Sequence, residues 1–253
     1  MRAVIMAAGM GRRMNNSIEM PKSILPVGET TIIRHTVKML TDNGISTAVV
    51  VGYRKNDIYS ALQGLPVTYY FNPFFKVTNS MASLWFAKEF LSSKDDIILC
   101  NADVFWQEDI LNEVLKDDHR IVMLGDKTRG SVGDYCFELT EDSFINSFGK
   151  NLEDGKKHTE YVGIGRIKKD FVLTFCNLLN DAVEREVYDL WWENVIYDNC
   201  IRYPIFVKDI SEHFWGEVDV MSDYMRIQEY AENHHIISRR KHNAVINRND
   251  SQK

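Results

Sequence analysis

The chain opens with the stretch that decides how it folds: Val4-Ile5-Met6-Ala7-Ala8-Gly9-Met10-Gly11-Arg12-Arg13-Met14, followed by Pro21-Lys22. A short apolar run that leads into a glycine bend is typical of a buried strand followed by a ligand-binding loop. Gly9 and Gly11 lack a Cβ, so the backbone can approach a ligand closely, and its N–H groups attract anions. Arg12, Arg13 and Lys22 add full positive charge. We therefore interpret this stretch as a phosphate-binding loop.

Three other interpretations of the loop were compared with this one. A dinucleotide fingerprint would need a third small residue where Met14 stands, and it normally carries no pair of arginines, which disfavours an NAD-linked oxidoreductase. A Walker loop would need Gly-Lys-Ser/Thr, which is absent. A plain glycine turn with surface arginines stays open as the third interpretation.

Composition limits the classes of protein that remain. A chain of 253 residues with 45% hydrophobic content can bury one large core, and a net charge of −6 argues against a nucleic-acid binder. No apolar run reaches the ~18 residues that a membrane span requires. The four cysteines form no C-x-x-C pair, as expected for free thiols in a reducing compartment. We expect a cytoplasmic protein that binds neither nucleic acid nor membrane.

Strand and helix patterns alternate through the first half, which is typical of a parallel sheet covered on both faces. The expected strands are 4–6, 47–51, 67–71, 97–100, 121–124, 135–139, 143–148, 161–167 and 203–207, and the expected helices are 33–40, 57–62, 81–91, 171–179, 190–198 and 224–232. The predicted fold class is α/β, a Rossmann-like, mixed and mostly parallel sheet flanked by helices. We expect one domain over 1–233, with a nucleotide-binding part at 1–125, a small acceptor-binding part at 126–233, and a polar basic tail at 234–253.

The strings IMAAGMGRRM and PKSILPV resemble the N-terminal signature of nucleotidyltransferases that join a nucleoside triphosphate to a phosphorylated small molecule. The resemblance implies that the loop wraps the base and the triphosphate, and that the lysine after proline, Lys22, contacts the reacting phosphates with help from Arg12. It also implies that two aspartates hold Mg²⁺. The loop residues it assigns to the nucleotide are Ala7, Ala8, Gly9, Gly11 and Arg12.

Two aspartates are candidate metal ligands. Asp103 follows the predicted strand 97–100, at the carboxyl edge where open α/β sheets place their ligands. Asp219 ends a short apolar strand in Trp215-Gly216-Glu217-Val218-Asp219, and the resemblance places the second metal aspartate here. Mg²⁺ takes carboxylate oxygens together with phosphate oxygens and waters. The alternatives are an Asx turn or helix cap at Asp103 and an ordinary cap of the last helix at Asp219.

A second resemblance covers the remainder of the chain up to about residue 230. Three strings look like segments of bacterial CTP:phosphocholine cytidylyltransferases: Asp189-Leu190-Trp191-Trp192-Glu193-Asn194, Phe214-Trp215-Gly216-Glu217-Val218-Asp219 and Asn79-Ser80-Met81-Ala82-Ser83-Leu84-Trp85. The last string implies that Asn79 and Ser80 border the nucleotide and the acceptor. This string departs from the pattern of that group at Ser80-Met81-Ala82. The resemblance therefore leaves phosphocholine, 2-aminoethylphosphonate and similar compounds as candidate acceptors.

Aromatic and acidic side chains suit a cationic amine, because the ring quadrupole and the negative charge both attract it. The candidate acceptor-binding residues are Trp85, Tyr188, Asp189, Trp192 and Glu193. The alternative is that these rings simply pack in the core.

We expect a Mg²⁺-dependent cytidylyltransferase that joins CTP to a small phosphate or phosphonate and releases pyrophosphate. One alternative is a hexose-1-phosphate nucleotidyltransferase that uses UTP or dTTP. A second alternative is a regulatory protein that binds a nucleotide without catalysis. The sequence leaves a homodimer open.

Overall fold

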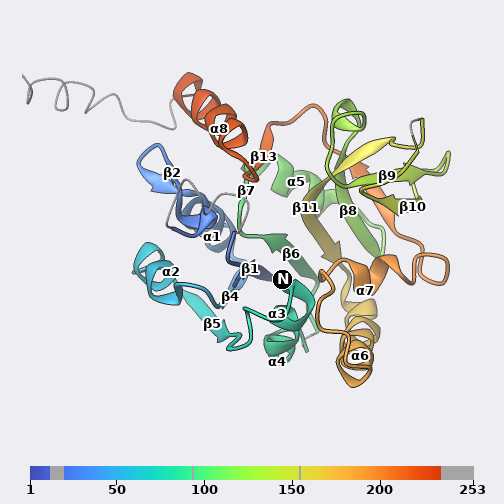
Figure 1. Cartoon of the computed structure of the whole chain (residues 1–253), viewed down its shortest axis with the longest axis horizontal. Helices are drawn as coiled ribbons and strands as arrows, with labels where there is room; N and C mark the ends of the chain where they lie inside the picture. The colour runs from blue at the N-terminus through green and yellow to red at the C-terminus, as the bar shows by residue number, and fades with distance from the viewer. Residues whose placement is uncertain (12–19, 93, 154, 235–253) are drawn as a thin grey trace, which may run out of the picture.

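A computed structural model describes residues 1–11, 20–92, 94–153 and 155–234 of the chain (Figure 1). Its centre is a nine-stranded sheet in which the strands run in the order β10-β9-β11-β6-β1-β4-β5, with β8 beside β11 and β12 beside β8. Four neighbouring strands are parallel, and β11 is antiparallel to both β6 and β8. The predicted fold class, a mixed and mostly parallel α/β sheet, is therefore confirmed.

The parallel part has four strands, of which three are largely buried on both faces, as central parallel strands must be, while the edge strand Val67–Phe71 is only partly buried. They are β1 (Arg2–Ala7), β4 (Ser46–Val51), β5 (Val67–Phe71) and β6 (Ile97–Asn101). Alternate residues of β1 face opposite cores: Val4 packs with residues of α3 (Ser80–Phe86), α4 (Lys88–Leu91) and α6 (Lys169–Glu184), while Ile5 packs with residues of α1 (Ile32–Asp42), α2 (Lys55–Ala61) and α5 (Glu108–Lys116). Helices therefore cover both faces, and the carboxyl edge of β1 and β6 is left for a ligand.

The other half of the sheet is built around β11 (Thr159–Ile167), whose nine residues are all buried. Its partners are β8 (Ile121–Asp126), β9 (Cys136–Leu139) and, through them, β10 (Ile145–Gly149) and β12 (Phe206–Asp209). The register shifts between Tyr161 and Gly165, and Gly163 has a φ of +82°, a conformation that glycine adopts without strain.

A two-stranded sheet joins distant parts of the chain. β7 (Val104–Trp106) pairs antiparallel with β13 (Trp215–Glu217), and α8 (Met221–Asn233) follows at once (Figure 1). Phe105, Val218 and Ile227 are buried in one small core that holds this unit against the opening segments β2 (Pro26–Val27) and β3 (Thr30–Thr31), next to the short helix η1 (Lys22–Ile24). The last quarter of the chain is thereby fixed beside the start.

Some expected elements differ from the observed ones. The helix expected at 81–91 is interrupted at Ala87, and the helix expected at 190–198 shrinks to α7 (Asn194–Tyr197). The strand expected at 203–207 begins three residues later, at Phe206. Among the described residues no helix is long and apolar enough to cross a bilayer. The tail predicted at 234–253 falls outside the description from residue 235 onward, and the division into parts at residue 125 stays a prediction.

Candidate active site

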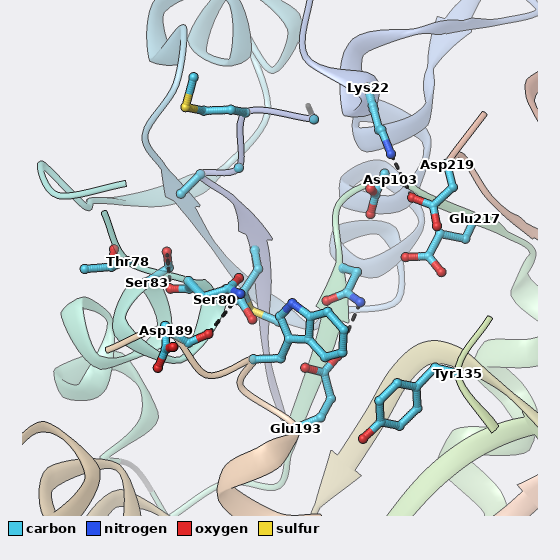
Figure 2. Close-up of a pocket in the computed structure, with 18 of the residues that line it drawn as sticks. Lys22, Thr78, Ser80, Ser83, Asp103, Tyr135, Asp189, Glu193, Glu217 and Asp219 are labelled. Atoms are coloured by element: carbon cyan, nitrogen blue, oxygen red, sulfur yellow. Dashed lines mark hydrogen bonds and ion pairs between the residues drawn. The ribbon is translucent and has the colours of Figure 1, made fainter. Parts of the chain in front are cut away.

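A cavity of about 600 Å³ opens at the carboxyl ends of β1 and β6 (Figure 2). Its walls come from the glycine loop with Lys22, from residues 75–83 up to the start of α3, from the ends of β6, β11 and β13, and from residues of the 134–150 and 189–197 segments. Asp103, Glu217 and Asp219 lie with Lys22 at one end, and Glu193 and Tyr135 lie toward the other end. Candidate site residues from the first and last quarters of the chain therefore meet in this cavity.

The acidic end is assembled by the pairing of β7 with β13. Glu217 stands opposite Val104 in the ladder, and the backbone N–H of Val218 donates a 3.0 Å hydrogen bond to the carbonyl of Asp103. Because side chains alternate along a strand, Glu217 and Asp219 point to the same side. One carboxylate oxygen from each of Asp103, Glu217 and Asp219 lies within 4.8 Å of the other two. The two predicted aspartates are thus brought together, with a third carboxylate that the prediction omitted.

Positive and negative side chains lie together at this end of the cavity. Lys22 is 8% exposed, and its Nζ forms a 2.8 Å ion pair with Oδ1 of Asp219. Burial raises the pKa of Glu217 well above its ordinary value, and the charges of Asp103 and Asp219 raise it further. Carboxylate oxygens are the hard ligands that Mg²⁺ takes, and a divalent cation would relieve the repulsion among the three. The cluster therefore fits the expected Mg²⁺.

The carboxylate that caps the start of α8 belongs to Asp223, not to Asp219. The Oδ2 atom of Asp223 accepts 2.9 Å hydrogen bonds from the backbone N–H groups of Asp219 and Val220, so Asp223 occupies the free donors at the start of α8. The carboxylate of Asp219 is left to face Lys22 and the cavity.

The glycine loop lines the cavity through Ala8, Gly9, Met10 and Gly11. Gly11 has a φ of +59°, and a Cβ there would lie 3.2 Å from Cγ of Lys22, so glycine lets the lysine pass under the loop. Ala7, also expected to bind the nucleotide, is the buried last residue of β1 and lies against a smaller pocket beside Lys22. The predicted catalytic residue Arg12, with Arg13 and Met14, lies outside the described residues.

Asn79 and Ser80 line the cavity and also hold the segment 188–192 against α3. Oδ1 of Asn79 accepts from the backbone N–H of Ser80 at 2.8 Å, and its Nδ2 donates to the carbonyl of Asp189 at 3.1 Å. Oγ of Ser80 accepts from the backbone N–H of Trp192 at 2.9 Å. These contacts position the residues that follow, whatever the ligand.

Of the five predicted acceptor-binding residues, Asp189 and Glu193 line the cavity. Trp192 is fully buried, and its indole N–H donates to Oδ1 of Asn101 at 3.1 Å. Tyr188 is 41% exposed and lies outside the cavity wall. The indole N–H of Trp85 donates to Oδ1 of Asn180 on α6 at 3.0 Å, which also places this ring outside the cavity.

Glu193 is the most perturbed carboxyl at the acceptor end. It is 5% exposed, and burial raises its pKa to about 7 even though Nδ2 of Asn101 donates to its Oε1 at 3.3 Å. Tyr161 and Tyr197, from β11 and α7, also line the cavity, and burial together with the nearby charge of Glu193 raises the pKa of both phenols. Trp191, which belongs to the acidic and aromatic string 189–194, also lines the cavity, and the wall includes polar and aromatic residues to which the sequence assigned no role: Asn101, Asp134, Tyr135, Lys150 and Glu160.

Comparison with known proteins gives this geometry a family. Residues 3–157 match the family model described as a MobA-like NTP transferase domain. The chain belongs to this family. It is 23% identical to a choline-phosphate cytidylyltransferase of Streptococcus pneumoniae, over 92% of this chain and 99% of that protein, and 24% identical to a CTP:phosphoglutamine cytidylyltransferase of Campylobacter jejuni, over 88% and 97%.

The fold agrees with this membership. A solved structure of CTP:phosphocholine cytidylyltransferase from Streptococcus pneumoniae superimposes with a TM-score of 0.70 at 19% identity, covering 90% of this chain and 98% of that one. The expected resemblance is therefore confirmed, and this member of the NTP transferase family is a nucleotidyltransferase. Its cavity offers what such a transfer requires: donors and a cation for phosphates, and carboxylates for a metal ion, at one end of a space large enough for a nucleotide.

Proposed function

We propose that the protein is a Mg²⁺-dependent cytidylyltransferase that joins CTP to a small phosphate or phosphonate carrying an amine, with release of pyrophosphate. One observation carries the proposal: a single cavity holds Lys22 with three carboxylates at one end and a buried acid among aromatic rings at the other. The first end suits a triphosphate with its metal ion, and the second suits an organic cation. The cytidylyltransferases among the relatives favour CTP as the nucleotide.

The reaction needs charge neutralisation and alignment more than covalent chemistry. An oxygen of the acceptor attacks the α-phosphorus, the bond between the α-phosphorus and the α,β-bridging oxygen breaks, and pyrophosphate leaves with the electron pair. Lys22 is a compact cation that can contact phosphate oxygens from its place beneath Gly11, and in this position it already balances Asp219. Asp103 and Asp219, together with Glu217, would hold Mg²⁺, which supplies positive charge against the phosphates.

The acceptor end gives the second substrate its direction. Glu193 and Asp189 attract a cation, while the same charges repel a phosphate, so the phosphate or phosphonate of the acceptor turns toward Lys22 and the loop. An acceptor with a positive group at one end and a negative group at the other is therefore held with its nucleophilic oxygen toward the nucleotide. This polarity distinguishes the site from one that binds a neutral sugar through hydroxyl groups.

Pyrophosphate release tests the proposal. CTP, UTP, dTTP and ATP are each combined with 2-aminoethylphosphonate, phosphoethanolamine, phosphocholine and glucose 1-phosphate in the presence of Mg²⁺. Turnover with CTP and an amine acceptor is expected. Turnover confined to glucose 1-phosphate with UTP or dTTP would identify a hexose-1-phosphate enzyme, and tight CTP binding without any pyrophosphate would identify a regulatory protein.

Substitution of the carboxylates tests the metal assignment. Asp103→Ala or Asp219→Ala is expected to lower turnover by ~10³-fold or more while the far-UV spectrum is unchanged, because a phosphoryl-transfer site that loses its metal ligand loses most of its charge stabilisation. Asp57→Ala is the matched control, since Asp57 pairs with Arg54 on α2 and is not part of the cavity wall. Turnover within a few fold of the parent enzyme in either cavity variant would refute the assignment.

A further inference from the structure

Three buried oxygen-bearing side chains meet at the acceptor end of the cavity. Glu193, Tyr161 and Tyr197 are 5%, 8% and 1% exposed and come from the 188–193 segment, β11 and α7. The rings of Tyr161 and Tyr197 pack edge to face with centroids 6.1 Å apart. All three residues line the cavity. The buried hydroxyl groups of both tyrosines make no hydrogen bond of ordinary geometry, although the Tyr161 hydroxyl also interacts with the carboxyl of Glu193 and with the hydroxyl of Tyr197.

Buried hydroxyl groups without a hydrogen bond of ordinary geometry are uncommon, because each loses its hydrogen bonds to water and gains little in return. Two of them beside one buried carboxyl in a ligand cavity indicate that the missing partner belongs to the ligand. A phosphate is disfavoured at this place because the ionised carboxyl of Glu193 repels it. A neutral hydroxyl group could bond to the phenols but would leave the carboxylate without a counter-charge.

The indole in the cavity wall does not offer an open face to a methylated cation. Trp191 is the one tryptophan of the cavity wall, and the ammonium of Lys150 already lies 5.1 Å from the centroid of its ring. Tyr135 packs edge to face against the same indole, with centroids 5.6 Å apart. Lys150 is held there by a 2.6 Å ion pair with Asp134. A quaternary ammonium group donates no hydrogen bond and relies on ring faces and carboxylates, so it would have to displace a lysine to reach this indole.

We infer that Glu193, Tyr161 and Tyr197 form a receptor for a primary ammonium group, so that the acceptor is a phosphorylated or phosphonate primary amine and a quaternary amine is rejected. The inference rests on the proposed function and names the class of acceptor. An –NH₃⁺ group donates three hydrogen bonds, and the receptor supplies three oxygens. Each phenol oxygen can accept one N–H, and Glu193 accepts another while its negative charge balances the cation.

A series of acceptors that differ only in methylation tests the inference. Phosphoethanolamine and its N-methyl, N,N-dimethyl and N,N,N-trimethyl forms carry three, two, one and no N–H donors. With CTP and Mg²⁺ held constant, kcat/KM is expected to fall at every step and to be at least ~30-fold lower for the trimethyl compound, phosphocholine, than for phosphoethanolamine. A kcat/KM for phosphocholine equal to or above that for phosphoethanolamine would overturn the inference and leave the proposed function standing.

Removal of the hydroxyl groups separates a binding role from simple packing. Tyr161→Phe and Tyr197→Phe keep the rings and are expected to lower kcat/KM for phosphoethanolamine ~5-fold or more through KM, with little change for phosphocholine. Tyr203→Phe is the control, because Tyr203 packs on Phe171 and is not part of the cavity wall. The inference would be overturned if both cavity variants kept the parent's ratio of kcat/KM for phosphoethanolamine to kcat/KM for phosphocholine. Turnover of glucose 1-phosphate with none of any amine would instead refute the proposed function.

Discussion

Glu193→Gln should stabilise this protein and impair it at the same time. Burial raises the pKa of Glu193 from its ordinary 4.5 to about 7, so between these values the folded protein holds a proton that the unfolded chain has released. Stability therefore falls as pH rises through this window. Because one pKa unit corresponds to 1.36 kcal/mol, the ionised side chain costs the folded state roughly 3 kcal/mol at pH 8. Glutamine removes this cost and keeps the oxygen that accepts from Asn101.

The free energy of unfolding, measured by urea denaturation at pH 5 and pH 8 in a chelating buffer, is the assay. The variant should exceed the parent by roughly 3 kcal/mol at pH 8 and by less than about 1 kcal/mol at pH 5, because little of the parent's penalty has developed there. The exposed Glu212→Gln is the control, with an expected change within about 0.5 kcal/mol at both pH values. A gain of equal size at both pH values, or a less stable variant at pH 8, would refute the electrostatic reasoning.

Other predictions concern the metal end, Trp85 outside the cavity, and the register shift in β11. Glu217→Gln should raise the Mg²⁺ concentration for half-maximal turnover about tenfold without loss of fold, in a metal titration of pyrophosphate release; an unchanged midpoint would remove Glu217 from the metal site. Trp85→Phe should leave KM for the acceptor within about twofold of the parent, because its ring lies outside the cavity, and a large rise in KM would contradict that placement. Gly163→Ala should lower the free energy of unfolding by about 2 kcal/mol or more, because the φ of Gly163 is +82° and the new Cβ would lie 2.7 Å from Val104. Calorimetry measures this change, and an unaltered melting temperature would show that β11 relaxes freely.

The sequence was most informative where local pattern decides structure. The strand 67–71 was predicted with its observed bounds, because an alternating run of β-branched and aromatic residues has few other conformations. Asp103 was predicted from its position after an apolar strand at the carboxyl edge of the sheet, and Asp219 from the resemblance of its string to a family signature. Glu217 was overlooked, although its position two residues before Asp219 places both on one side of an extended chain.

The acceptor end could not be predicted in the same way. Tyr135 lies in the loop before β9, Tyr161 in β11 and Tyr197 in α7, and only tertiary packing brings their rings together. The helix expected at 190–198 forms only from residue 194, since the carbonyls of Tyr188 and Leu190 accept hydrogen bonds from the start of α3 instead of building a helical turn. Long-range hydrogen bonds of this kind leave no periodic signal in the sequence.

Because β7 pairs with β13, the acidic end of the cavity can form only after the last part of the chain has been synthesised. Asp103 is synthesised early and Asp219 more than a hundred residues later. A nascent chain on the ribosome can therefore complete its parallel strands long before its metal-binding cluster can form. A product of premature termination before residue 215 would keep the glycine loop and Lys22 but none of the late carboxylates. Truncated copies are thus expected to be catalytically inactive even where the nucleotide loop is present.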